Sequence, residues 1–383
     1  MTRQPHTRSG LTITGTDGEF SVRAQRLDTY RIHIGDGLSG QIGTLLKPLA
    51  GDLAAPRIVI LADAGVLHHL PAIAEAAGSA GVPVACVTVA AGEASKSGEG
   101  LIRAWEQLHQ LGATRRTLLV ALGGGAICDL VTTAAATFMR GLPYALIPTT
   151  LVAQLDAAIG GKGGIDYQET KNLIGAFHHP AAVFIDPALT RTLPICHLRN
   201  GIAEAIKVAI IADPDLFATI EAAAGELSAS QLTGIIKGAV AAKLGLLAAD
   251  PFEQRDLRRL LNLGHCIGHP LEAATGYLMP HGEAVAAGIA VATVIGHAAG
   301  ACASPERDRI LAVLAAHGLP TTIDPGLDEA IWQRLDAIRR IRNGPLNLVI
   351  PQRPGNCVIL PDIDRPAFDN ALRELRARRR GPQ

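Results

Sequence analysis

Hydrophobic positions follow two different patterns along this chain of 383 residues. In the first half, short apolar runs typical of strands alternate with segments whose apolar residues recur at helical spacing. The strand-like runs are Tyr30–Ile34, Arg57–Ala62, Val84–Val89, Thr117–Leu122 and Pro143–Pro148, and the helical segments are Ala72–Ala80, Gly98–Leu111 and Asp129–Met139. Such alternation predicts a Rossmann-like parallel sheet covered by helices.

From about Asn200 onward the pattern is almost entirely helical. Alanine- and leucine-rich segments with helical periodicity cover Ile202–Ala212, Leu216–Leu227, Gln231–Leu247, Leu257–Thr275, Ala284–Ala299 and Pro305–His317, and short strands follow at Leu346–Ile350 and Cys357–Leu360. We therefore predict an α/β plus all-α protein, with a nucleotide-binding α/β domain over residues 1–194 and a helical domain over residues 195–383. Residues 1–16 are polar and are expected to form a disordered tail.

Composition excludes several classes of partner. Hydrophobic residues make up 48% of the chain and the formal net charge is +0, so no nucleic-acid or membrane partner is indicated. We find no run long and apolar enough to cross a membrane, and no secretory signal. The six cysteines have no paired spacing, which favours reduced thiols in a cytoplasmic enzyme. The basic run Arg376–Arg380 is read as a solvated helix end or tail.

Glycine clusters mark the region with the strongest chemical signal. A strand-like run ends at Gly123-Gly-Gly125, where the backbone can approach a ligand and a following helix can bind an anion. Lys162 lies among the glycines of residues 160–164, and Lys171-Asn172 follows shortly after. Lysine, asparagine and arginine interleaved with glycine suit a phosphorylated substrate.

Histidines and a glutamate in the second half have the composition of a metal site. Glu204 and Lys207 share a helix face, as do His265 and His269, and His281 follows twelve residues later. Two histidines and a carboxylate leave open positions on a divalent metal, which is typical of catalytic zinc. Spacing alone favours His265 with His269 as the metal pair. The alternative is that these histidines are packed and hydrogen-bonded without a metal.

Together these motifs resemble the 3-dehydroquinate synthase family, within the sugar phosphate cyclases. The matching strings are Gly123-Gly-Gly-Ala-Ile-Cys-Asp129-Leu, Met139-Arg140-Gly, Pro148-Thr-Thr-Leu, Gly161-Lys162, Lys171-Asn172-Leu-Ile-Gly-Ala-Phe177, Ala203-Glu204-Ala-Ile-Lys207, Leu261-Asn262-Leu-Gly-His265 and His281-Gly-Glu-Ala-Val-Ala-Ala-Gly288. The likeness runs from about residue 30 to about residue 360.

The resemblance implies a set of roles for residues of this chain. Glu204, His265 and His281 would bind zinc or cobalt, and His269 would face the substrate instead. The contacts to NAD would come from Asp63, Glu93, Lys96, Gly123, Gly124, Gly125, Asp129, Thr149, Thr150, Asp156, Lys171 and Thr192. The catalytic and substrate-binding residues would be Lys162, Asn172, Lys207, Lys243, Arg258, Asn262, His269, Arg140 and Arg340, with Arg140 reaching across the interface of a homodimer.

The resemblance also implies a reaction. Enzymes of this kind oxidise a secondary alcohol with NAD, eliminate phosphate, return the hydride, open the ring and close a carbocycle by aldol addition. The leading expectation is 3-dehydroquinate synthase, a phosphate lyase of the shikimate pathway of aromatic amino acid biosynthesis. It converts a 3-deoxy-heptulosonate 7-phosphate, a small phosphorylated sugar acid, to 3-dehydroquinate. Arg258 favours this carboxylated substrate, because an arginine fork matches a carboxylate.

Departures from the family pattern keep other substrates open. Arg339-Arg340 stands where Lys-Lys is usual, Gly163 and Asp166 replace a threonine and an asparagine, and Pro270 follows His269 in place of alanine. Strings near the front of the chain also look like the valiolone-forming cyclases. A secondary-metabolism cyclase of the aminodehydroquinate synthase or 2-epi-5-epi-valiolone synthase type is therefore the main alternative. Two further alternatives remain. One is a metal-dependent polyol dehydrogenase, whose fold this domain pair also resembles, and the other is a non-catalytic homologue.

Overall fold

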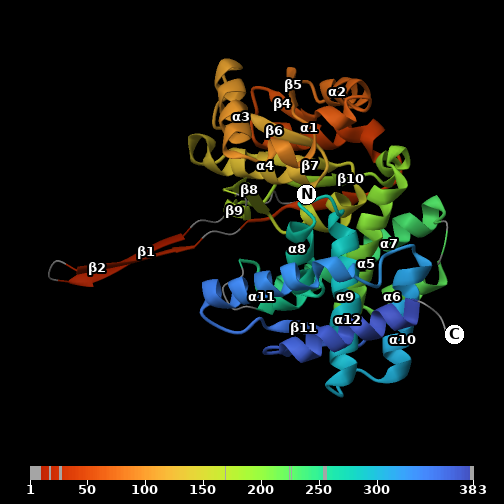
Figure 1. Ribbon diagram of the computed structural model, residues 1–383. Helices are drawn as coiled ribbons and strands as arrows, with labels where there is room; N and C mark the ends of the chain where they lie inside the picture. Colours follow the sequence, from red (N-terminus) through yellow and green to blue (C-terminus); the bar gives the residue numbers. More distant parts are fainter. Residues whose placement is uncertain are drawn as a thin grey trace. The chain divides into compact units, whose positions relative to one another are not determined.

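The computed structural model describes residues 10–379, except 17–18, 26–27, 169, 224, 226 and 253–256. The chain forms two compact units (Figure 1). The first consists of Met1–Pro148 with Gly161–Ile185, and the second of Thr149–Gly160 with Asp186–Gln383. The predicted α/β sheet followed by a helical region is confirmed. The domain boundary expected near Pro194 stays a prediction.

A six-stranded parallel sheet forms the centre of the first unit. Its strand order is β3-β10-β7-β6-β4-β5. The strands are β3 (Arg31–Ile34), β4 (Ile58–Asp63), β5 (Val84–Val89), β6 (Leu118–Gly123), β7 (Tyr144–Pro148) and β10 (Ala182–Ile185). Every residue of β4, β6, β7 and β10 is buried, which explains why these segments are continuous apolar runs rather than alternating ones.

The direction of the chain through this sheet creates a binding position. From β4 the chain moves outward to β5, whereas from β6 it moves outward to β7 on the other side. In open α/β sheets, ligands bind beyond the carboxyl ends of the two strands at such a reversal. Asp63 ends β4 and Gly123 ends β6, and the preceding residues, Ala62 and Leu122, are register partners.

Among the described residues, the helices that accompany the sheet are α1 (Ile42–Asp52), α2 (Leu70–Gly78), α3 (Gly98–Gln110) and α4 (Gly125–Thr137). The helix expected from Asp129 therefore begins four residues earlier, directly after the glycine turn. This earlier start matters because it places the free N–H groups of the helix at the end of β6.

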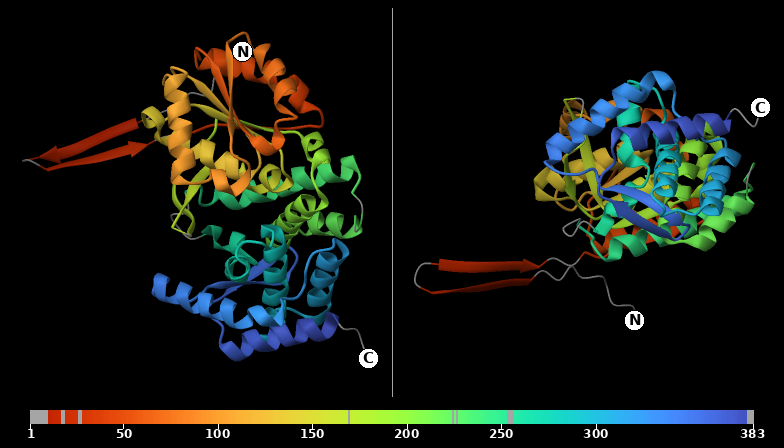
Figure 2. Two further views of the ribbon diagram at one scale, coloured as in Figure 1. Left: turned by 45° about the horizontal axis from the view of Figure 1, so that its top comes forward. Right: turned by 60° about the horizontal axis from the view of Figure 1, so that its bottom comes forward.

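The described part of the first unit also contains two antiparallel hairpins. One, β8 (Lys162–Tyr167) with β9 (Thr170–Phe177), packs on α4. The other, β1 (Gly10–Thr16) with β2 (Glu19–Gln25), forms a two-stranded ribbon (Figures 1 and 2). The prediction of a disordered tail is wrong for Gly10–Thr16, because apolar and threonine positions alternate there with strand periodicity. The rest of that predicted tail, residues 1–9, lies outside the described residues.

The second unit is a helical assembly around one central helix. Its helices are α5 (Ile195–Ala212), α6 (Pro214–Ala222), α7 (Ala229–Ala248), α8 (His265–Ala274), α9 (His281–Ala298), α10 (Ser304–Ala316), α11 (Asp328–Arg342) and α12 (Arg365–Arg379), with a hairpin of β11 (Leu348–Arg353) and β12 (Asn356–Leu360). Every residue of α9 from Ala284 to Gly296 is buried. Helices α5, α8, α10 and α12 pack around it (Figure 1).

One expected helix is broken in a way that matters for the site. The prediction of a single helix over Leu257–Thr275 is wrong, because a short 3-10 helix, η7 (Leu257–Asn262), is followed by a break before α8. Gly264 adopts φ 78°, which a helix interior does not accommodate, and a Cβ there would lie 2.5 Å from the carbonyl oxygen of Val285. This break makes His265 the first residue of α8.

The sequence predicts no run long and apolar enough to cross a membrane, and helix α7 contradicts that expectation. It has 20 residues and is apolar enough, by length and composition, to cross a membrane. Of its apolar window 33% is buried, the buried residues include the ionisable Lys243, and the helix packs against α5 and α6.

Two other sequence features, the cysteines and the basic run, can be located in the structure. All six cysteines are free thiols. In the basic run near the C-terminus, Arg376 pairs with Asp328, and Arg378 pairs with Asp308 and Glu374. These arginines thus belong to a helix end with local ion pairs, while Arg380 lies outside the described residues.

Candidate functional site

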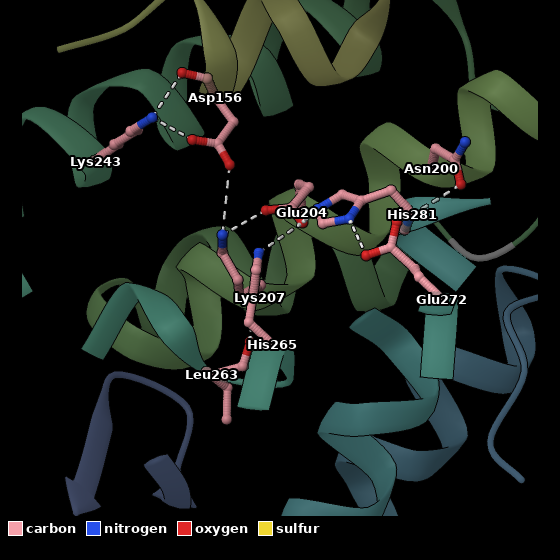
Figure 3. A network of polar contacts seen from close by, with 10 residues as sticks. Asp156, Asn200, Glu204, Lys207, Lys243, Leu263, His265, Glu272 and His281 are labelled. Atoms are coloured by element: carbon pink, nitrogen blue, oxygen red, sulfur yellow. Dashed lines mark hydrogen bonds and ion pairs between the residues drawn. The ribbon is translucent and has the colours of Figure 1, made fainter. Parts of the chain in front are cut away.

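Three separate helices bring Glu204, His265 and His281 together. Glu204 comes from the middle of α5, and the two histidines are the first residues of α8 and α9 (Figure 3). The Nε2 atom of His281 lies 3.3 Å from Glu204 Oε1, and that of His265 lies 3.8 Å from the same oxygen. One potential ligand atom from each residue lies within 4.8 Å of the others, so the three could hold a metal ion.

Hydrogen bonds to the outer ring nitrogens orient both imidazoles. His265 Nδ1 lies 3.1 Å from the carbonyl oxygen of Leu263, and His281 Nδ1 lies 3.1 Å from Glu272 Oε2. A carbonyl or carboxylate oxygen only accepts, so each Nδ1 donates and a neutral ring keeps its lone pair on Nε2. Such outer contacts are typical of histidines that bind metals.

The carboxylate of Glu204 fits a cation. Glu204 is 1% exposed, and among the described residues neither of its oxygens makes a hydrogen bond of ordinary geometry. The Lys207 ammonium lies 2.5 Å from Oε2 as an ion pair. Burial alone would raise the pKa of Glu204, but Lys207 and the neighbouring histidines lower it to about 2. A buried carboxylate that remains ionised needs positive charge around it.

The two histidines differ in their electrostatics. Burial, together with Lys207, lowers the pKa of His265 to about 3, so its ring is neutral and can bind a metal. Burial would also lower the pKa of His281, but the carboxylates of Glu204 and Glu272 raise it to about 10. A metal ion bound here would displace the proton of His281, since only the unprotonated nitrogen is a ligand.

His269 stands beside this cluster. Its ring centroid is 5.0 Å from that of His265 and 5.8 Å from that of His281. With Glu272 and His281 it forms a second group that could hold a metal, although His269 itself is exposed. Spacing suggested a pair of His265 and His269, whereas the structure also brings Glu204 and His281 to His265. The assignment of the ligands stays a prediction.

A buried ion-pair network adjoins the cluster within the second unit (Figure 3). Asp156, in a π-helical turn, η5 (Ala153–Ala157), accepts hydrogen bonds from Lys243 at both its carboxylate and its carbonyl oxygen, the latter at 2.6 Å. Lys207 Nζ lies 3.4 Å from the other carboxylate oxygen. Burial opposes ionisation, yet Lys243 and Lys207 hold the pKa of Asp156 well below its usual range. Sequence reasoning gave Asp156 a contact with NAD and missed this network.

The end of β4 meets the glycine turn in the first unit. Asp63 accepts hydrogen bonds from the backbone N–H groups of Gly65, at 2.7 Å, and Gly92, at 3.0 Å. Gly123 has φ 152°, and a Cβ there would lie 2.5 Å from Ile127 Cγ2 and 2.7 Å from Asp63 Cβ. Only glycine therefore allows β6 to turn into α4 this tightly, and this leaves the helix N-terminus open to an anion.

Charged residues predicted to contact NAD gather next to this turn. Lys96 is buried and lies 2.6 Å from Asp129 and 3.8 Å from Glu93. Lys171 lies 3.9 Å from Glu93. Burial would lower the pKa of Lys96, but Asp129 and Glu93 raise it, so the ammonium stays charged.

The β8–β9 hairpin is fastened to the same segment. The N–H of Asp166 donates to the carbonyl oxygen of Lys96, at 2.8 Å, and Asp166 Oδ1 accepts from the N–H of Asn172, at 2.8 Å. Asn172 adopts φ 56°, a left-handed conformation that asparagine tolerates. A Cβ at residue 163 would lie 2.6 Å from Thr132 Cγ2, which explains why glycine replaces the usual threonine there.

Family models cover most of the chain. The model of the 3-dehydroquinate synthase N-terminal family matches residues 86–200, and that of the C-terminal family matches residues 201–340. The chain belongs to the 3-dehydroquinate synthase family of sugar phosphate cyclases.

Relatives within the 3-dehydroquinate synthase family carry two different names. The chain is 44% identical over 385 residues to the 2-epi-valiolone synthase of Stigmatella aurantiaca, covering 96% of this chain and 94% of the relative. It is 38% identical over 357 residues to the 3-dehydroquinate synthase of Synechococcus sp., covering 91% and 96%. The structure of ValA, a 2-epi-5-epi-valiolone synthase from Streptomyces hygroscopicus with NAD+ and Zn2+ bound, is 29% identical with a TM-score of 0.84, covering 94% of this chain and 99% of ValA.

The remaining residues expected from the family resemblance lie in varied surroundings. Lys162, Asn172, Asn262, Arg140 and Arg340 are exposed. The side chain of Arg258 lies outside the described residues. Thr150 accepts a hydrogen bond from the N–H of Ala153, Thr149 is buried, and Thr192 ends a 3-10 helix, η6 (Pro187–Thr192). Their roles, and those of Gly124 and Gly125 at the start of α4, stay predictions.

The arginines that replace the family's lysines behave differently from each other. Arg339 pairs with Asp336 and Asp362 and lies over the ring of Trp332. Arg340 is the exposed member, so it is the one left for the predicted phosphate contact.

Proposed function

We propose that this chain is a zinc- and NAD-dependent sugar phosphate cyclase of the 2-epi-valiolone synthase type. Its substrate would be a seven-carbon ketose phosphate without a carboxylate, such as sedoheptulose 7-phosphate. The observation that carries the proposal is the 44% identity to a 2-epi-valiolone synthase over 96% of the chain, against 38% for the 3-dehydroquinate synthase of Synechococcus sp.. This identity supports the main alternative of the sequence analysis at least as well as its leading expectation.

Both cofactors have residues that fit them. The features that suit NAD are Asp63, the turn at Gly123 and the N-terminus of α4. ValA, whose chain is related to this one, has NAD+ and Zn2+ bound. The buried carboxylate of Glu204 and the two Nε2 atoms that face it suit zinc. When bound, zinc supplies a Lewis acid for an alcohol or carbonyl oxygen, and NAD accepts a hydride and returns it.

The buried lysines suit the phosphate of the substrate. Burial would lower the pKa of Lys207, but Glu204 and Asp156 raise it, so its ammonium is charged at neutral pH. The Asp156 carboxylate also fixes the position of Lys243. Positioned cations neutralise a phosphate dianion and favour its departure. The substrate's own phosphate, held in place by the protein, would accept and donate the protons of neighbouring groups. Oxidation, phosphate elimination, reduction, ring opening and aldol closure then give a redox-neutral conversion to a carbocycle and phosphate.

A specific observation favours 3-dehydroquinate synthase as the second candidate. Arg258 and Asn262 occupy positions that match the family's substrate-binding strings. An arginine fork is suited to a carboxylate, which the heptulosonate phosphate carries and sedoheptulose 7-phosphate lacks. With either substrate we expect a cytoplasmic homodimer and a phosphate lyase.

The test is a substrate comparison. Purified protein with zinc and NAD is offered sedoheptulose 7-phosphate and, separately, 3-deoxy-heptulosonate 7-phosphate, and phosphate release and product mass are followed. We expect phosphate and a valiolone-type carbocycle from the first. Turnover of the second alone would establish 3-dehydroquinate synthase. NADH accumulation without phosphate would establish a dehydrogenase, and no reaction with either would support a non-catalytic homologue.

A further inference from the structure

A buried carboxylate outside the expected ligand set contacts one of the metal-site histidines. Glu272 lies on α8, is 3% exposed, and its Oε2 accepts the Nδ1–H of His281 at 3.1 Å (Figure 3). Burying a carboxylate without a partner is costly, and this hydrogen bond provides one. The bond leaves only Nε2 of His281 to face Glu204.

The backbone at His281 is held as firmly as its ring. The N–H of Gly282 donates to Asn200 Oδ1 at 3.1 Å, and a Cβ at residue 282 would lie 2.4 Å from the carbonyl oxygen of Asn200. Asn200 lies on α5, one helical turn before Glu204. The helix that supplies Glu204 therefore also fixes where α9 begins, and Glu272 fixes how the His281 ring is turned.

We propose that Glu272 is a positioning residue of the metal centre, which orients His281 Nε2 toward Glu204 and does not itself bind the metal. The inference rests on the proposed function, because it takes Glu204, His265 and His281 as the ligands. The competing role for Glu272 is that of a metal ligand, because Glu272, His269 and His281 also lie close enough together to bind a metal. In that role a carboxylate oxygen of Glu272 would bind the metal directly, so the two roles predict different responses to substitution.

Zinc binding alone separates these roles. Apoprotein is prepared with a chelator and titrated with Zn2+ against a competing dye, for the wild type, Glu272→Gln, Glu272→Ala and His281→Ala. Glutamine keeps an oxygen that can accept from Nδ1, so Glu272→Gln should bind nearly as tightly as the wild type. Glu272→Ala should bind one zinc roughly 10- to 100-fold more weakly, the usual effect of losing an outer-shell partner. His281→Ala should lose far more.

The control is Glu283→Gln, which changes an acidic residue in the first turn of the same helix as His281. Its zinc affinity should match the wild type. Cobalt substitution adds a spectroscopic readout: Glu272→Gln should keep the visible bands of the wild type, and Glu272→Ala should shift them. Thermal unfolding of the metal-free variants checks that the fold survives.

Two outcomes would overturn the proposal. Unchanged zinc affinity in Glu272→Ala would show that the contact does not position His281. A loss in both Glu272 variants as large as that in His281→Ala would make Glu272 a ligand. Failure of the wild type to bind zinc would remove the proposed function as well, whereas intact zinc binding without turnover would remove only the function.

Discussion

Replacing Gly288 by alanine should weaken the fold and the metal site together. Gly288 lies in the middle of α9, where a Cβ would lie 2.0 Å from the carbonyl oxygen of Gly264 and 2.9 Å from its carbonyl carbon. Ordinary contacts between heavy atoms are about 3.5–4.0 Å, so more than an ångström of overlap would have to be relieved. The opposing atoms are backbone and cannot rotate away, so α8 and α9 would have to separate.

This overpacking should lower the free energy of unfolding by about 1–3 kcal/mol or more. The displaced Gly264 precedes His265, and α9 begins with His281, so the same movement would separate two expected metal ligands. Urea unfolding followed by circular dichroism measures the stability, and metal analysis after dialysis measures the site. We expect both to fall in Gly288→Ala.

The matched control is Gly245→Ala in α7, where a Cβ would meet nothing within 4 Å. Alanine there should stabilise the helix by roughly 0.5–1 kcal/mol, because glycine loses more conformational freedom on folding. If Gly288→Ala proved as stable as Gly245→Ala and kept its metal, the reasoning from close helix packing would be refuted.

Three further predictions concern ligands, cofactor and pH. His281→Ala should lose most bound zinc while His269→Ala keeps about one equivalent by metal analysis, and equal losses would contradict the ligand assignment. Asp63→Ala, which removes the acceptor of two backbone N–H groups, should weaken NAD binding in calorimetry by about tenfold or more; unchanged affinity would place NAD elsewhere. The hydrogen bond from Arg339 lowers the pKa of Asp362, and the pair is partly exposed, so Asp362→Asn should cost less than about 1 kcal/mol at pH 7. A carboxyl with a depressed pKa contributes stability above its unfolded pKa of about 3.9 and loses it as the pH falls through the folded value. The difference in unfolding free energy between the wild type and this variant should therefore shrink below about pH 4, and a constant difference would refute the contribution.

The strands of the sheet could be predicted from the sequence because each strand is marked by residues within its own segment. Buried strands such as Ile58–Asp63 and Leu118–Gly123 are continuous apolar runs, and the glycine turn marks where the second ends. The β1–β2 hairpin was missed because the polar composition of the N-terminus outweighed its alternation. The break at Gly264 was missed because a glycine in a helical pattern does not reveal whether its φ is positive.

The candidate metal site could be predicted only in part from spacing. His265 and His269 are four residues apart, so a helical pattern alone pairs them, but the helix starts at His265 and its partners come from other helices. The sequence placed Glu204 among the candidate groups, but only the family resemblance assigned it to the ligand set with His265 and His281. The contact between Lys243 and Asp156 joins residues 87 positions apart, and no sequence period reveals such a pairing.

The most direct test of the metal centre is anomalous scattering from crystals of the zinc-loaded protein, recorded at the zinc absorption edge. We predict a single strong peak roughly 2.0–2.2 Å from a carboxylate oxygen of Glu204 and from Nε2 of His265 and His281, with Glu272 still hydrogen-bonded to His281 Nδ1. A peak bonded instead to His269, Glu272 and His281 would contradict the account.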